Sequence, residues 1–283
     1  MRLVVKVGGA QIEEATGRED LAQAVAAARA AGHEVILVHG GGNQIRTLSK
    51  QLGLPDRYHD GLRITDAATA DVVLMVLAGL VNKPLVAALE AHGVRACGLC
   101  GADGSAFTAE RLRVPGVDLG YVGTIARVDA RLVETLLGAG FVPVVATVAP
   151  GPDHDPGTDP RTNVPRTFLR FFNLNADTGA GPLAAAFAAE AMLFLTDVPG
   201  VLDAGKQRLP RLSPRQCREL RARGVIAGGM IPKVDAALAA LAECPRATVK
   251  IAPARGSNAI LEALSAAVGT QLVADTQAHS THG

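Results

Sequence analysis

Short apolar runs alternate with longer Ala-rich segments along most of this chain. Val35–Val38 and Met192–Leu195 contain no polar residue, which is typical of strands buried on both faces of a parallel sheet. Leu21–Ala31 and Ala180–Ala189 have the composition of helices that connect such strands. The alternation therefore predicts an α/β protein in which helices cover both faces of a mostly parallel sheet.

The size and charge of the chain limit its partners. Its 283 residues allow one large domain or two smaller lobes, because domains usually contain about 100–200 residues. A net charge of +1 with 3% aromatic residues disfavours nucleic acid as a partner. The first apolar run is short and contains Lys6, so we expect no signal peptide and no membrane association.

Cys97 and Cys100 form a C-x-x-C pair, a spacing that occurs in redox and zinc sites. The pair lies in an apolar run that leads into a glycine turn, and no second pair of ligands follows. We therefore favour small core residues over a redox or metal site, and we assign no metal ligands. Cysteines outside a disulfide framework are typical of a reducing compartment, so we expect a cytoplasmic protein.

Two predicted strands end in glycine turns. Lys6-Val-Gly-Gly9 closes the first, and His39 is followed by the three glycines of Gly40–Gly42. Ligands of open α/β sheets bind at the carboxyl ends of strands, where glycines let backbone N–H groups approach an anion. We interpret both turns as a phosphate site. Ile45 replaces the third glycine of a dinucleotide fingerprint, which argues against a nicotinamide dehydrogenase.

Two further glycine segments include a lysine. Gly228-Gly229 precedes Lys233 at the start of a predicted helix, an arrangement suited to phosphate that is weak evidence alone. Gly200–Gln207 nearly matches a P-loop, but Gln207 stands where a P-loop has a Mg²⁺-binding Ser or Thr. We therefore expect a turn or β-hairpin there, with Lys206 exposed.

Polar residues also precede two predicted helices. One residue of Asn173-Leu-Asn-Ala-Asp177 can cap the following helix, but capping does not explain all three polar side chains. Arg63 lies shortly before Thr65, which we expect to be an N-cap. The guanidinium of Arg63 can bind a carboxylate with two hydrogen bonds or form a surface ion pair, and the local sequence leaves both open.

Taken together and in order, six motifs resemble the amino-acid kinase superfamily, and within it most closely the N-acetylglutamate kinases. The motifs are Lys6-Val-Gly-Gly9, Val38-His-Gly-Gly-Gly42, Gly61-Leu-Arg-Ile-Thr-Asp66, Asn173-Leu-Asn-Ala-Asp177, Leu195-Thr-Asp-Val-Pro-Gly-Val-Leu202 and Gly228-Gly-Met-Ile-Pro-Lys233. Val81-Asn-Lys83, Gly98–Gly104 and Gly120–Gly123 are similar too. The resemblance covers nearly the whole chain, residues 2–273.

The resemblance implies a three-layer αβα sandwich. Residues 1–172 would form a lobe that binds an acyl amino acid and dimerises, and residues 173–283 a lobe that binds ATP. Lys6 and Lys233 would stabilise the transferred phosphoryl group, with Asp177 orienting both lysines. The acyl amino acid would contact Gly41, Gly42, Arg63 and Asn173. The nucleotide, with Mg²⁺ bound mainly by its phosphates, would contact Gly8, Gly9, Asp197, Val198, Pro199, Gly200, Val201, Leu202, Val225, Ile226 and Ala227.

The implied reaction is ATP-dependent phosphorylation of the side-chain carboxylate of N-acetyl-L-glutamate, a step in arginine biosynthesis. This carboxylate has an ordinary pKa of about 4.3, so it is ionised at pH 7 and needs no general base. Because two anions must meet, the site needs positive charge and N–H donors around the γ-phosphoryl group. The lysines and glycine turns of the motifs would supply both.

Two other functions remain open on the sequence alone. One is a kinase for carrier-linked aminoadipate or glutamate in lysine biosynthesis. The other is a non-catalytic amino-acid sensor on the same fold, against which the presence of Lys6, Asp177 and Lys233 argues.

The chain departs from the family pattern in two places. Pro150–Arg170 contains five prolines and predicts a long exposed loop or a connection between lobes, with Arg161, Arg166 and Arg170 near the substrate lobe. The sequence begins directly at the first strand, without the helix that precedes it in arginine-inhibited members. We therefore expect a homodimer that is insensitive to arginine.

Overall fold

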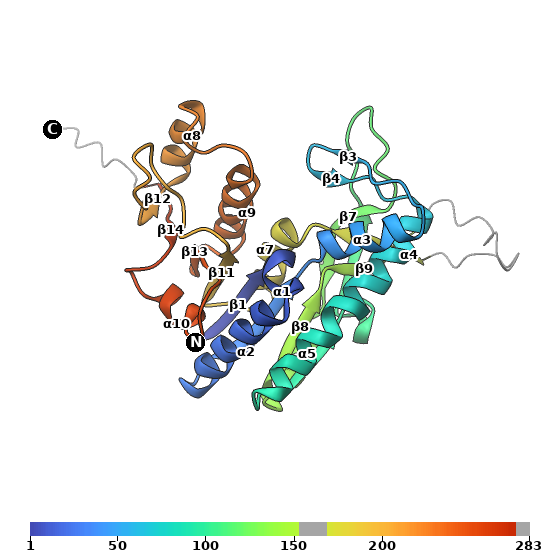
Figure 1. Cartoon of the computed structure of the whole chain (residues 1–283), viewed down its shortest axis with the longest axis horizontal. Coiled ribbons are helices and arrows are strands. Elements are labelled where there is room, and N and C mark those ends of the chain that lie inside the picture. Colours follow the sequence, from blue (N-terminus) through green and yellow to red (C-terminus); the bar gives the residue numbers. More distant parts are fainter. Residues whose placement is uncertain (153–168, 276–283) are drawn as a thin grey trace, which may run out of the picture.

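The computed structural model describes residues 1–152 and 169–275. These residues form an eight-stranded sheet of order β12-β14-β13-β11-β1-β2-β8-β5. Its strands are β1 (Arg2–Val7), β2 (Glu34–His39), β5 (Ala96–Leu99), β8 (Val142–Ala146), β11 (Ala191–Thr196), β12 (Arg211–Leu212), β13 (Thr248–Pro253) and β14 (Thr270–Leu272). Within this order, each neighbouring pair from β13 through β11, β1, β2 and β8 to β5 is parallel. The next strand, β14, pairs antiparallel with β13. In Figure 1, β1 lies near the middle of the molecule, between the orange-to-red C-terminal elements and the green strands.

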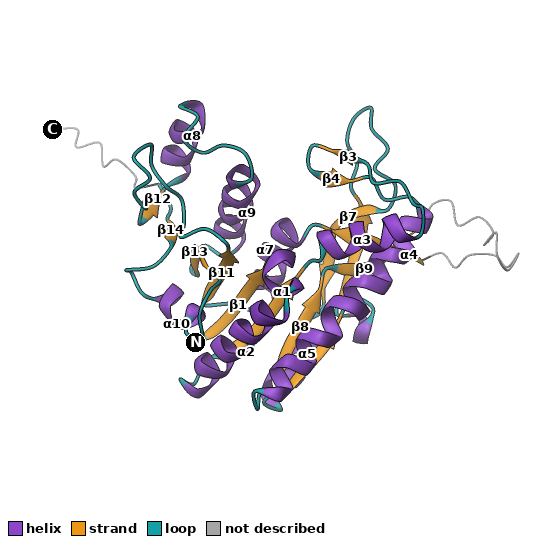
Figure 2. Cartoon of the chain, viewed as in Figure 1, coloured by secondary structure: helices purple, strands orange, loops and turns teal. Residues whose placement is uncertain are grey.

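Helices cover both faces of this sheet, because neighbouring residues of each strand point to opposite faces. Val5 belongs to one buried cluster and Val4 to the other. The Val5 face is covered by α1 (Gly9–Glu13), α2 (Ala15–Ala30), α3 (Gly42–Gln51), α4 (Ala67–Met75), α5 (Asn82–Ala91) and α10 (Ala259–Leu264). The Val4 face is covered by α6 (Arg131–Gly138), α7 (Ala176–Ala186), α8 (Pro214–Ala222) and α9 (Met230–Glu243). Figure 2 shows α2 and α5 in front of the strands, and the predicted three-layer αβα sandwich is confirmed.

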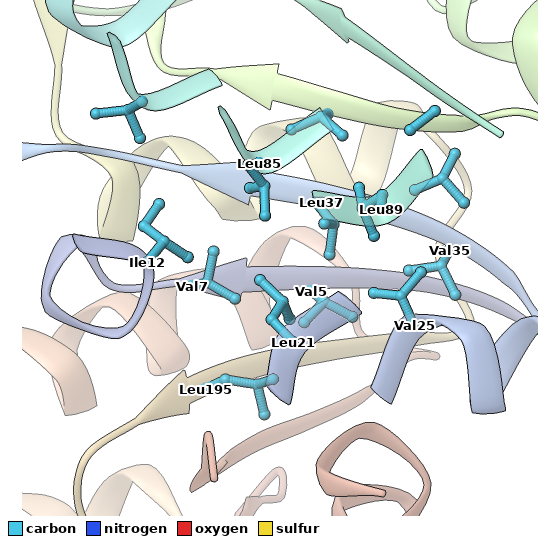
Figure 3. Close-up of a cluster of buried hydrophobic side chains, with 14 of the residues drawn as sticks. Val5, Val7, Ile12, Leu21, Val25, Val35, Leu37, Leu85, Leu89 and Leu195 are labelled. Atoms are coloured by element: carbon cyan, nitrogen blue, oxygen red, sulfur yellow. The ribbon is translucent and has the colours of Figure 1, made fainter. Parts of the chain in front are cut away.

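The core between α2, α5 and the sheet consists of aliphatic side chains. Figure 3 shows Val5 and Leu37 of adjacent strands packed between Leu21 of α2 and Leu89 of α5. All four side chains are almost completely buried. Removing such branched side chains from water contributes about 1.5–3 kcal/mol each, which holds both helices against β1 and β2.

A smaller sheet of order β6-β7-β10-β9 extends the Val4 side of the molecule. It contains β6 (Phe107–Arg111), β7 (Val122–Val128), β9 (Val148–Pro152) and β10 (Leu169–Leu174). The sequence predicts that Pro150–Arg170 is a long exposed loop or a connection between lobes. The loop prediction is wrong at the two ends of the segment, where Gly151 pairs with Arg170 in the sheet. Because β9 is an edge strand of this sheet, its prolines remove no ladder hydrogen bond. Arg161 and Arg166 lie outside the described residues.

Arg170 lies away from the glycine turns. Its guanidinium is 3.7 Å from the Asp71 carboxylate and lies over the Tyr121 ring. The predicted division into lobes at residues 172 and 173 falls within β10 and stays a prediction.

Ala67–Ala91 is one continuous helical run, although the Ala/Leu pattern of the sequence predicts two separate helices, Ala67–Gly79 and Lys83–His92. A π-helical turn, Val76–Val81, joins α4 to α5. Pro84 has no N–H to donate to the Leu80 carbonyl, so an α-helical hydrogen bond cannot form there. This run is the one helix among residues 1–152 and 169–275 that is long and apolar enough to span a membrane, and its inner face fills the core.

Gly101 provides a test of how the two sheets pack. A Cβ at this position would lie 2.4 Å from the Phe107 carbonyl oxygen and 2.5 Å from Ala149 Cβ. We expect Gly101→Ala to lower the free energy of unfolding by about 1–3 kcal/mol, measured by urea denaturation. Gly138, at the end of α6, has open space around its Cα, so Gly138→Ala should leave stability unchanged or slightly higher. Equal effects of the two substitutions would contradict this packing.

Candidate functional site

A pocket of about 290 Å³ opens where β1 and β2 end. In Figure 1 this region lies at the end of β1 from which the chain enters α1. The glycine turns after the two strands touch, because a Cβ on Gly9 would lie 3.4 Å from Gly41 Cα. The predicted site residues that line this pocket are Lys6, Gly9, Gly41, Gly42, Arg63, Asn173 and Asp177.

Lys6 and Asp177 form an ion pair at the base of this pocket. Lys6 Nζ is 2.6 Å from Asp177 Oδ1, and Lys6 is only 7% exposed. Asp177 lies in the first turn of α7, which is capped by Asn175 through hydrogen bonds from the Asp177 and Thr178 N–H groups. Capping thus accounts for one residue of the Asn173–Asp177 motif, and leaves Asn173 and Asp177 free to face the pocket.

Arg63 forms part of the pocket wall, so its ion pair is not a contact on the protein surface. It is 6% exposed and donates hydrogen bonds to the Asp56 carboxylate, the Tyr58 hydroxyl and, at 3.1 Å, the Gly42 carbonyl. Its guanidinium also lies 4.8 Å from the centre of the Tyr58 ring. A planar cation held on several sides is oriented before a ligand binds, which favours recognition of a carboxylate.

Asn173 is connected to the same wall through Thr65. Asn173 Nδ2 lies 3.3 Å from Thr65 Oγ1, which in turn donates to the Arg63 carbonyl at 2.9 Å. The expectation that Thr65 caps α4 is wrong, because Asp66 accepts the hydrogen bond from the Thr69 N–H. Thr65 is fully buried and connects the two predicted substrate-binding residues.

Sequence reasoning missed several residues of this pocket. Arg46 of α3 and Tyr58 of the β3 (Tyr58–His59) and β4 (Leu62–Arg63) hairpin line it, as does Thr147. Arg46 lies 3.2 Å from the Asp56 carboxylate, so Asp56 bridges two arginines. No sequence motif indicates these residues. The two strands of the hairpin are only two residues long each, and isolated polar residues show no periodic pattern that would predict their position.

Lys233 and the predicted nucleotide residues, apart from Gly9, lie outside this pocket. Lys233 Nζ is 3.4 Å from the Gly229 carbonyl at the start of α9, and within the described chain no ion pair joins it to Asp177. A hydrogen bond from Thr196 lowers the pKa of Asp197, as do the charges of Lys233 and Arg255. Asp197 lines a neighbouring cavity of about 460 Å³ with Arg255.

The other predicted nucleotide-binding residues differ in their burial and in the residues that they contact. Val201 and Ile226 are almost fully buried in the core, so neither side chain faces a cavity. Gly8 lies under the Gln11 side chain, because a Cβ there would be 2.2 Å from Gln11 Oε1. Gly200 has a φ of 136° and lies against Thr270, whose Oγ1 accepts a hydrogen bond from the Val201 N–H.

The near match to a P-loop is a tight turn, as predicted. The Asp203 N–H donates to the Gln207 carbonyl at 2.8 Å, and Leu202 forms an antiparallel bridge with Arg208. Lys206 is exposed and adopts a φ of 61°. This lysine therefore serves as a control for the two lysines assigned to chemistry.

Cys100 is a core residue. Burial raises the pKa of its thiol to about 11, which keeps the thiol protonated at neutral pH. Among residues 1–152 and 169–275, no three His, Cys, Asp or Glu side chains are grouped to bind a metal.

His39 is fully buried behind the glycine turn. Burial lowers the pKa of its imidazole to about 4, with a smaller contribution from the charge of Lys83, while a hydrogen bond to the Gly40 carbonyl acts in the opposite direction. His39 is therefore neutral at physiological pH.

Residues 1–251 match the model of the amino acid kinase family. With the parallel sheet, the paired Lys6 and Asp177 and the adjoining glycine turns, this match shows that the chain belongs to the amino acid kinase family. The relatives include acetylglutamate kinases of Methanopyrus kandleri, 44% identical over 87% of this chain and 93% of theirs, and of Koribacter versatilis, 41% identical over 97% and 99%.

Solved structures agree with the fold. The structure of smu.665 from Streptococcus mutans matches 97% of this chain and 99% of its own with a TM-score of 0.76 and 27% identity. Giardia lamblia carbamate kinase bound to AMP-PNP matches 97% of this chain and 98% of its own with a TM-score of 0.65, and at 14% identity this likeness concerns the fold alone.

The buried His39 predicts a pH dependence of stability. In the folded protein the His39 imidazole has a pKa of about 4 and stays neutral down to that pH. In the unfolded chain it binds a proton near its ordinary pKa of 6.5. Lowering the pH from 6.5 towards 4 therefore favours the unfolded state. Between about pH 7.5 and about pH 5, we expect the wild type to lose about 2 kcal/mol more free energy of unfolding than His39→Asn. Urea denaturation at both pH values measures this, and equal losses would contradict it.

Proposed function

We propose that this protein transfers the γ-phosphoryl group of ATP to the side-chain carboxylate of N-acetyl-L-glutamate. The observation that supports this most directly is the Lys6–Asp177 ion pair, which lies where the glycine turns of β1 and β2 meet. The acetylglutamate kinases of Methanopyrus kandleri and Koribacter versatilis match this chain over 93% and 99% of their own length. We propose arginine biosynthesis as its pathway.

The reaction needs charge stabilisation more than proton transfer. A carboxylate oxygen attacks the γ-phosphorus, a new P–O bond forms, and the bond from the γ-phosphorus to the bridging oxygen breaks. The products are an acyl phosphate and ADP, and no proton is transferred in this step. Because negative charge accumulates on the phosphoryl oxygens, cations and N–H donors that are already in place lower the barrier.

We assign the residues of the pocket to this chemistry as follows. Lys6 would neutralise the phosphoryl oxygens, and its ion pair with Asp177 keeps Nζ in one position. The Gly41 and Gly42 N–H groups would donate to the reacting anions from the start of α3. Arg63 and Asn173 would bind the carboxylate and amide of the acyl amino acid, since both already line the pocket wall.

The nucleotide would bind beside this pocket, along the ends of β1 and β11. Gly8 and Gly9 would approach its phosphates, and Lys233 would reach them from the start of α9. The remaining contacts would come from Asp197, Val198, Pro199, Gly200, Val201, Leu202, Val225, Ile226 and Ala227.

Mg²⁺ fits this arrangement as a companion of the nucleotide. The described residues offer no cluster of three acidic or imidazole ligands, and Mg²⁺ in kinases is usually bound by phosphates, waters and one or two carboxylates. When bound, it would neutralise charge on the phosphate oxygens.

A comparison of acceptors tests the proposed function. ADP release is measured with N-acetylglutamate, glutamate, aspartate, N-acetyl-aminoadipate and UMP. We expect turnover with N-acetylglutamate and at least about 10²-fold lower kcat/KM with glutamate and aspartate, because a site with hydrogen-bonding groups for the acetamide leaves them unpaired with the free amines. Absence of turnover on every acceptor would exclude the proposal and favour a carrier-linked substrate or a sensor.

Substitution of the two lysines tests their roles. We expect Lys6→Ala and Lys233→Ala each to lower kcat by about 10²–10³-fold with smaller changes in KM, because each removes charge that acts mainly in the transition state. Lys206→Ala removes an exposed lysine of the tight turn and should leave kcat unchanged. A near-normal kcat in either of the first two variants would exclude that lysine from the chemistry.

We propose further that the protein is a cytoplasmic homodimer. The outer side of the Ala67–Ala91 run supports this, because the large apolar side chains of Met75 and Leu80 are 51% and 61% exposed there. Leu80→Asp should shift the sedimentation coefficient from dimer to monomer, since a buried carboxylate is costly in an apolar interface. Leu52→Asp alters a similarly exposed leucine at the end of α3 and should not. A hexameric wild type, or a dimeric Leu80→Asp, would contradict this proposal.

A further inference from the structure

Behind the glycine turn of β2, a fully buried histidine contacts the turn and a neighbouring helix. His39 Nδ1 lies 3.0 Å from the Gly40 carbonyl oxygen, and His39 Nε2 lies 3.0 Å from Asn82 Nδ2. Asn82 is also fully buried and is the first residue of α5, directly after the π-helical turn. Neither side chain lines the pocket, so neither can touch a ligand there.

The partners of Asn82 determine which nitrogen of His39 holds the proton. Asn82 Nδ2 lies 2.9 Å from the Val144 carbonyl oxygen, which only accepts hydrogen bonds, so this atom of the amide must be the donor. Its second hydrogen points to His39 Nε2, which must then accept. The remaining nitrogen, Nδ1, is therefore protonated and donates to the Gly40 carbonyl. The hydrogen bonds of Asn82 are compatible with this one neutral tautomer.

Lys83 and Gly98 keep Asn82 in this orientation. Lys83 Nζ donates to Asn82 Oδ1 at 3.1 Å and to the Gly98 carbonyl at 3.0 Å. A Cβ on Gly98 would lie 1.8 Å from Asn82 Oδ1, so only glycine leaves room for the amide. Two motifs that the proposed reaction does not use, Val81–Lys83 and the segment that begins at Gly98, therefore meet in this network.

The imidazole acts on the peptide that joins Gly40 to Gly41. In a trans peptide the C=O and N–H groups point in opposite directions. When His39 binds the Gly40 oxygen, the Gly41 N–H is directed away from the buried ring. Within residues 1–152 and 169–275 this N–H has no protein acceptor, and Gly41 lines the pocket. The donor is thus available for an anion.

We propose that His39, kept in its Nδ1–H tautomer by Asn82, is a positioning residue that aims the Gly41 N–H at the reacting anion. The contribution is geometric: the ring accepts no proton from the substrate and touches none of the reacting atoms. The proposal rests on the phosphoryl transfer proposed above, because it needs the glycine turn to bind an anion.

Two amide substitutions separate positioning from packing. The side-chain amide of asparagine can place an N–H donor near the position of Nδ1, whereas that of glutamine reaches the position of Nε2. We expect His39→Asn to retain the hydrogen bond to Gly40 and to keep kcat within about tenfold of the wild type. His39→Gln retains the contact with Asn82 but loses the one with Gly40, and should lower kcat by about 10²-fold with less effect on KM. Loss of activity to the same extent in both variants would overturn the proposal.

His92 provides the matched control and NMR a direct readout. His92 Nδ1 lies 2.9 Å from the Ala88 carbonyl near the end of α5, away from the pocket, so His92→Asn and His92→Gln should both leave kcat unchanged. The ¹⁵N chemical shifts of the wild-type His39 ring at pH 7 should show the Nδ1–H tautomer. An Nε2–H tautomer or a doubly protonated ring would overturn the proposal without any variant. Failure of the proposed function itself would instead appear as a wild type with no turnover.

Discussion

The parallel pairing of β1 with β2 on one side and β11 on the other is the interaction on which the site depends. Its register places Lys6 opposite Val38 and Phe194, one residue before β1 ends. Parallel strands present their carboxyl ends at one edge, so the glycine turns after β1 and β2 meet there. Lys6 points to the same face as Val4, the face covered by α7, and Asp177 of α7 is therefore within reach of Nζ.

The charge of the site is local and nearly balanced. The whole chain has a net charge of +1, so no long-range field attracts an anionic substrate. At the pocket, however, Lys6 faces Asp177, and Arg46 and Arg63 share Asp56. These carboxylates compensate the cations before ligands arrive and hold them in position. Backbone N–H groups of the glycine turns add positive potential without a titratable charge.

The sequence predicts the parts of this site that follow from local chemistry. The strand ends, the glycine turns, a capping residue before α7 and the tight turn at Lys206 depend on neighbouring residues, and each can be derived from them. Tyr58 and Arg46 could not be predicted, because their positions depend on a short hairpin folding over α3. The paired ends of Pro150–Arg170 were also beyond reach, since prolines disfavour strands except at a sheet edge, and the edge is a property of the tertiary fold.

The π-helical turn has a consequence for how a long helix can follow a sheet. Buried residues of the Ala67–Ala91 run are spaced four apart, from Val73 through Leu77, Val81 and Leu85 to Leu89. In a regular α-helix each such step drifts by about 40°, so Val73 and Leu89 would lie on nearly opposite sides. The wider π-helical turn accommodates one additional residue. This residue offsets the following part of the helix by about 100° in the opposite direction and so cancels most of the drift. The irregularity thus acts as a phase correction that keeps one stripe of a 25-residue helical run in contact with the sheet.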